Sequence, residues 1–93
     1  MTRSETGSIA FPDFEEGSQL PSLVAKLAES LSTSARRPVG SSLELLIGFE
    51  GYPDEFALWW DGFTCELGCS RPCSVDLNAV TDKLLASGAF VRV

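Results

Sequence analysis

Three cysteines are the side chains of this sequence best suited to chemistry, since thiolates bind metals and thiols undergo redox reactions. Cys65, Cys69 and Cys73 have the spacing C-x3-C-x3-C, which is compatible with chelation of zinc. The sequence has no fourth cysteine and no histidine, so Asp61 or Asp76 would have to complete the ligand set. Structural zinc sites mostly use two well-separated ligand pairs. We therefore expect ordinary thiols rather than a metal centre or a Cys69–Cys73 disulfide or redox pair, and we expect no cofactor.

The lack of histidine limits the chemistry further, because histidine is the commonest general base and a frequent metal ligand. Neither a Ser-His-Asp nor a Cys-His arrangement can be assembled within this chain. Acidic residues and serines remain, but no G-x-S-x-G motif, phosphate-binding glycine loop or dinucleotide fingerprint accompanies them. We therefore expect the chain not to be an enzyme.

The charge balance of the sequence points to a class of partner. Thirteen acidic residues against seven basic ones give a formal net charge of −6. Nucleic acids and anionic membranes repel such a surface, whereas a basic protein is attracted to it. We expect a protein partner, basic in character, or a second copy of the chain, and we expect no nucleic acid and no membrane.

The composition of the sequence indicates a single domain. The chain has 93 residues, of which 44% are hydrophobic and 22% charged, values typical of a globular domain. Residues 1–8 are polar and are predicted to form a flexible N-terminal tail, with the domain over residues 9–93. No apolar run has the length of a signal peptide or membrane anchor, and an odd number of cysteines fits a reducing compartment. We expect a cytoplasmic protein.

Two helices are predicted from apolar residues that recur at helical spacing. The first helix is expected over residues 21–36, with Pro21 in its first turn and Arg36 at its end. The second is expected over residues 75–87, capped by Ser74. Their apolar stripes consist of Leu20, Leu23, Val24, Leu27 and Leu31 in the first helix, and Leu77, Val80, Leu84 and Leu85 in the second.

Three strands are predicted over residues 43–50, 56–60 and 63–67, and Asp61-Gly62 is typical of a two-residue hairpin turn. This turn places apolar residues opposite one another on one face of the sheet. The predicted pairs are Trp60 with Phe63, Leu58 with Cys65 and Phe56 with Leu67 on that face, and Trp59 with Thr64 and Ala57 with Glu66 on the other. The first strand then sets Leu45, Leu46 and Ile47 opposite Trp60, Trp59 and Leu58. Short edge strands are also expected near residues 8–11 and 90–93.

These elements predict an α+β fold in the order (β)-α-β-β-β-α-(β). Both helices need an apolar surface to cover, and one face of the antiparallel meander supplies it. Leu43, Leu45, Ile47, Phe49, Phe56, Leu58, Trp60 and Cys65 are assigned to that covered face.

The second face of the meander is the strongest candidate for a binding surface. Leu46 and Trp59 are expected at its centre, with Glu44, Glu50 and Glu66 around them. An aromatic residue surrounded by charge is typical of a protein-binding patch. A covering N-terminal segment or a homodimer would also explain it.

The sequence therefore predicts a small acidic, non-catalytic protein-binding module of the inhibitor, immunity or adaptor type. The alternative is a metal- or thiol-redox-linked ligand-binding protein that uses Cys65, Cys69 and Cys73.

Overall fold

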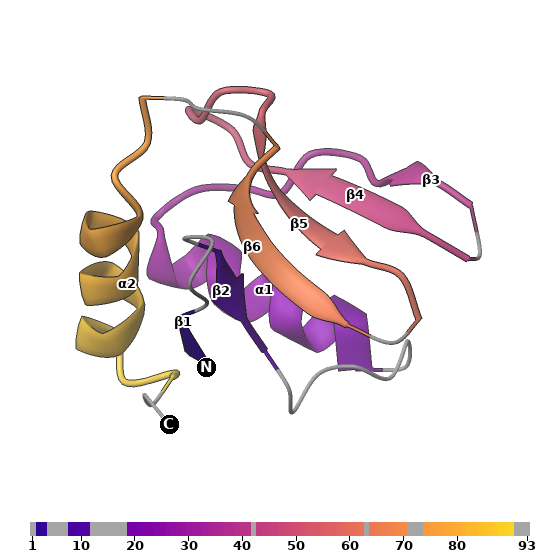
Figure 1. Cartoon of the computed structure of the whole chain (residues 1–93). Coiled ribbons are helices and arrows are strands. Elements are labelled where there is room, and N and C mark those ends of the chain that lie inside the picture. Colours follow the sequence, from indigo (N-terminus) through magenta and orange to yellow (C-terminus); the bar gives the residue numbers. More distant parts are fainter. Residues whose placement is uncertain are drawn as a thin grey trace.

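The computed structural model describes residues 2–3, 8–11, 19–41, 43–62, 64–70 and 74–90, of which 2–3 are described by their backbone alone. It has a six-stranded antiparallel sheet and two helices, so the α+β prediction is confirmed. In Figure 1 the central strands lie in front of α1, and α2 lies beside them. The elements are β1 (Thr2–Arg3), β2 (Ile9–Ala10), α1 (Leu20–Ser30), β3 (Val39–Gly40), β4 (Leu45–Gly48), β5 (Phe56–Trp60), β6 (Cys65–Cys69) and α2 (Leu77–Ala86). Across the sheet the strands follow the order β1-β2-β6-β5-β4-β3. No described helix is long and apolar enough to cross a membrane.

The pairing of β4 with β5 has the predicted register. Ile47 lies opposite Leu58, and Leu46 lies opposite Trp59. Alternation of apolar and polar side chains identified both the partners and the faces, because a slip of one residue would move every side chain to the wrong face.

The predicted register of β5 with β6 is wrong by two residues. Leu58 pairs with Leu67 instead of Cys65, and Trp59 pairs with Glu66 instead of Thr64. The connection is a wider loop over residues 61–64, closed when the Asp61 carboxylate accepts a hydrogen bond of 2.7 Å from the Thr64 N–H. This side-chain bond stabilises a longer turn than the Asp-Gly pair indicated. A shift of two leaves each residue on its predicted face.

The core lies between the sheet and the two helices. Its sheet side is formed by buried residues of four adjacent strands, and its helix side by α1 and α2. The residues are Ile9, Ile47, Phe56, Leu58, Cys65 and Leu67 from the strands, Leu20, Leu23, Leu27, Val80 and Leu84 from the helices, and Phe11, Leu31, Phe49 and Phe90 from the connections.

Both helices are shorter than predicted. α1 ends at Ser30 because Ser32 takes a left-handed conformation (φ 54°), and the N–H of Thr33 then donates to the carbonyl of Ala28 at 2.8 Å. This is the hydrogen-bond pattern of a Schellman ending. Arg36 therefore does not cap the helix. α2 begins later than predicted, since its N-cap is Asp76, whose carboxylate accepts from the N–H of Asn78 at 2.9 Å.

The sheet edges also differ from prediction. The strand near residues 8–11 is confirmed as β2, whereas β1 and β3 were not expected. Leu43 precedes β4 and is 79% exposed, so its assignment to the core face is wrong. Phe90 is buried against Phe11, with ring centroids 5.4 Å apart, but it is not part of a strand. Residues 91–93 and Phe63 lie outside the described residues.

Candidate functional site

A single cross-strand row forms the centre of the sheet face opposite the core. Residues directly opposite in an antiparallel ladder share a face, and the pairings connect β3, β4, β5, β6 and β2 in turn. The row is Val39, Leu46, Trp59, Glu66 and Ala10. Val39 is 67% exposed, and the other four are half-buried. We call this surface the open face.

The structure thus brings together the predicted site residues Leu46, Trp59 and Glu66. Val39 extends their apolar surface to the edge of the sheet, and sequence reasoning missed it. Pro38 and Gly40 on either side concealed the short strand β3, because both residue types normally interrupt strands. The alternation of the neighbouring strands gave no information about this segment.

Small residues form the neighbouring row of the open face. Gly48 lies opposite Ala57, which lies opposite Gly68. A Cβ at Gly48 would contact Cδ of Arg36 at 3.4 Å, and one at Gly68 would meet Cβ of Ser8 at 3.2 Å. The side chains of Arg36 and Ser8 therefore lie over the ends of this row, and Ala57 is only 1% exposed. Among the described residues of the open face, the accessible apolar surface therefore lies in the row of Trp59.

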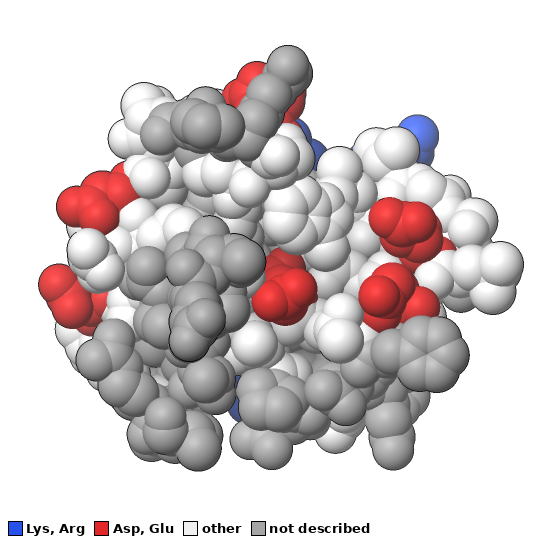
Figure 2. Space-filling model, in the orientation of Figure 1, with Lys and Arg blue, Asp and Glu red and all other residues white. Residues whose placement is uncertain are grey.

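The acidic residues of the predicted site have different surroundings. The Glu66 carboxylate accepts a hydrogen bond of 2.9 Å from the Ser8 hydroxyl. Glu44 is exposed, with no ion pair to any described residue. Figure 2 shows acidic side chains set among uncharged ones on this face, with basic side chains confined to small areas. Glu44 and Glu66 give the open face its negative charge.

Glu50, in contrast, belongs to a separate ion cluster. Its carboxylate is 3.9 Å from Nε of Arg36, which also pairs with Asp54 and donates to the carbonyl of Tyr52 at 2.9 Å. The guanidinium offsets part of the charge of Glu50. The structure therefore separates Glu50 from the row that contains Trp59.

The two cysteines that the structure describes are in different states. Cys65 is 2% exposed, lies opposite Trp60 and is not disulfide-bonded, whereas Cys69 is disulfide-bonded. The expectation of an ordinary thiol is therefore wrong for Cys69, and a disulfide sulfur is not a thiolate ligand. Cys73 lies outside the described residues. Within the part of the chain that is described, no group of three or more His, Cys, Asp or Glu side chains is placed to hold a metal ion.

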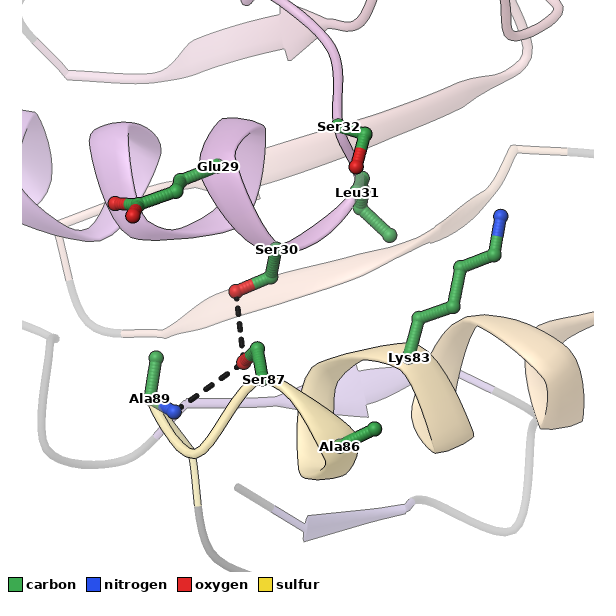
Figure 3. A pocket seen from close by; sticks show the side chains of 8 residues that line it. All are labelled: Glu29, Ser30, Leu31, Ser32, Lys83, Ala86, Ser87 and Ala89. Atoms are coloured by element: carbon green, nitrogen blue, oxygen red, sulfur yellow. Dashed lines mark hydrogen bonds between the residues drawn. The ribbon is translucent and has the colours of Figure 1, made fainter.

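A cavity of about 520 Å³ lies where the C-terminal ends of the two helices meet. Figure 3 shows its lining, in which the hydroxyl of Ser30 donates to that of Ser87 at 3.0 Å. The Ser87 hydroxyl in turn donates to the carbonyl of Leu84 at 2.7 Å. These serines join the helix ends. Among the described residues that line the cavity, neither Glu29 nor Lys83 forms a side-chain hydrogen bond with a serine hydroxyl.

A second hollow, of about 530 Å³, is almost entirely apolar and lies between α1, β4 and the chain before β3. We call it the α1–β4 groove. Its lining consists of Leu20, Pro21, Val24, Ala25 and Ala28 from α1, Ala35, Arg36 and Pro38 from the connection, and Leu45 and Ile47 from β4. The residue pattern did not predict this groove, because the groove arises from the early end of α1 and the path of the connection that follows it.

Comparison of the chain with protein-family models, with curated proteins and with solved structures finds no match to any of them.

Proposed function

We propose that this chain is a small acidic, non-catalytic protein-binding module that uses its open face, as an inhibitor, immunity or adaptor protein does. The observation that carries the proposal is the continuous row Val39–Leu46–Trp59, which places an aromatic side chain beside aliphatic ones on the face away from the core. Buried tryptophans surrounded by less critical contacts are the commonest hot spots of protein interfaces.

Charge supports a basic partner. Glu66 adjoins Trp59 across the ladder, and Glu44 lies on the strand segment that leads into β4. A partner that presents an apolar pocket bordered by Lys or Arg would match both features. Such complementarity mainly speeds association and selects among partners. The net charge of −6 acts in the same direction.

The proposal is tested by photo-crosslinking from the open face in cells that express the chain naturally. A photoreactive amino acid replaces Glu66 in one variant and Asp82, exposed on α2, in the control. We expect a protein that is crosslinked from position 66 and not from position 82.

The purified partner is then titrated against the native chain and against Trp59→Ala and Glu66→Lys. Trp59→Ala should weaken binding at least about 30-fold, the effect of a hot-spot residue. Crosslinks of equal yield from both positions, or full affinity of Trp59→Ala, would contradict the proposal.

One observation favours a thiol-redox role as the second candidate, namely the disulfide at Cys69. Cys69 ends β6 opposite Phe56, so its oxidation state acts on an edge of the core. On this reading, reduction changes ligand or partner binding. If the crosslinked partner binds with the same affinity with and without a reductant, the redox role is excluded. Elemental analysis of protein purified without chelator tests whether the cysteines bind a metal.

A further inference from the structure

The α1–β4 groove and the hairpin that joins β3 to β4 adjoin each other. The hairpin spans residues 39–46, and both Pro38, which precedes it, and Leu45, on its second strand, also line the groove. One edge of the molecule therefore carries both an apolar hollow and the β3–β4 hairpin, and Figure 1 shows the two strands of this hairpin on the side of the sheet away from α2.

The tip of this hairpin presents an apolar side chain to solvent. Leu43 is 79% exposed, and Val39 on the same hairpin is 67% exposed. Two hydrogen bonds hold the described residues of this tip, since the Leu43 N–H donates to the Ser41 hydroxyl at 3.2 Å and the Ser41 N–H donates to the Glu44 carbonyl at 2.8 Å. Gly40 permits this shape, since it has φ +129° and a Cβ there would collide with the Glu44 carbonyl oxygen. A leucine held out on a defined loop is a preorganised contact.

Uncompensated charges of opposite sign accompany the two apolar features. Glu44 follows Leu43 and is exposed, and Arg37 lies between the groove residues Arg36 and Pro38 and is also exposed. Neither Glu44 nor Arg37 forms an ion pair with a described residue. The loop thus combines an apolar side chain with a negative charge, and an exposed positive charge lies on the chain segment whose neighbouring residues line the apolar groove.

We infer that this edge is a homodimer interface, in which each copy inserts Leu43 into the α1–β4 groove of the other and Glu44 meets Arg37. Both halves of the interface lie on one edge, which is what a self-complementary two-fold contact requires. The arrangement also explains why this acidic chain has an exposed arginine, Arg37, beside an apolar groove. The interface shares Glu44 with the open face, but Trp59 and Glu66 take no part in it, so variants of Leu43, Ala25 and Trp59 separate the dimer from the proposed function. A dimer of this kind leaves Trp59 and Glu66 of both copies available to partners.

The test is sedimentation velocity of the native chain and its variants over a range of concentrations at physiological salt. The native chain should dimerise. Leu43→Glu on the loop and Ala25→Glu in the groove should each raise the dimer dissociation constant at least about 100-fold, because each places a charge in the apolar contact. Ala79→Glu is the matched control, since it also changes an exposed helical alanine, and it should dimerise like the native chain. Circular dichroism establishes that the variants are folded.

A charge exchange identifies the partner as a second copy. Arg37→Glu and Glu44→Arg should each weaken the dimer about tenfold, and the double variant should recover to within about threefold of the native constant. A native chain that remains monomeric at all concentrations would overturn the inference, with the groove then occupied by a different protein or by an apolar small molecule. So would a dimer that Leu43→Glu leaves intact, or a double variant with no recovery. Dimer loss on Trp59→Ala alone would assign the dimer to the open face instead.

Discussion

The two faces of the sheet differ although the same strands build both. On β5, Leu58 is buried in the core whereas the next residue, Trp59, lies half-buried on the open face. On β6, Leu67 is buried and Glu66 lies beside Trp59. The helices supply apolar surface to one face, where the buried strand residues are apolar or, at Cys65, a small thiol. The opposite face has a mixed composition, with Val39, Leu46 and Trp59 in one row with Glu66.

The two faces differ because burial constrains the residues of the core face more strongly than those of the open face. Burial of a polar group without a partner is costly, so the core face tolerates little variation. No such constraint demands an apolar row on the open face, where Thr or Lys would form an adequate strand. The apolar centre that Leu46 and Trp59 form is therefore the ground for proposing that this face binds a protein partner.

The largest expected effect comes from breaking the core face. Leu67→Ala removes a fully buried side chain that lies opposite both Leu58 and Ile9. It should lower the free energy of unfolding by about 3 kcal/mol, since a cavity remains. Urea denaturation followed by circular dichroism measures the loss, and a loss below about 1 kcal/mol would contradict the placement of Leu67.

A smaller effect is expected from removing the disulfide at the end of β6. Cys69→Ser should lower the free energy of unfolding by about 2 kcal/mol, because the unfolded chain regains freedom. The native chain should show the same loss when a reductant is added, and the variant should not respond to it. Equal stability of the native chain with and without reductant would show that the disulfide contributes nothing to the fold.

The smallest effect is expected on the open face. Glu66→Ala removes the half-buried hydrogen bond from Ser8 and should lower the free energy of unfolding by about 1 kcal/mol or less. Ser8→Ala provides the control, and the double variant should cost no more than the larger single change if the bond is the cause. A loss as large as that of Leu67→Ala would mean that Glu66 serves mainly to hold the fold.

Sequence patterns predicted the faces of the sheet better than its connections. Alternation placed Leu46 and Trp59 together, and it kept Glu66 on their face although the β5–β6 register proved two residues wrong, because side chains repeat with a period of two. The turn itself was mispredicted since Asp61 uses its side chain to close a wider loop. Such a bond depends on three-dimensional geometry that residue types do not reveal.

The ends of the helices were also poorly predicted from the sequence. Ser32 adopts a left-handed conformation that glycine normally takes, so the end of α1 carried no clear signal. Because α1 ends early, Arg36 lies beside Gly48 of β4 and the α1–β4 groove is left beside the helix. No periodicity in the sequence indicated either feature. The open face followed from local alternation, and the groove depended on how distant segments pack.

The most direct test compares two neighbours on β5, Leu58→Ala and Trp59→Ala, by urea denaturation followed by circular dichroism. If the open face serves recognition, Leu58→Ala should lower the free energy of unfolding by about 3 kcal/mol and Trp59→Ala by no more than about half of that. An equal or greater loss for Trp59→Ala would show that the tryptophan is required for folding, and would contradict the division of the sheet into a structural face and a binding face.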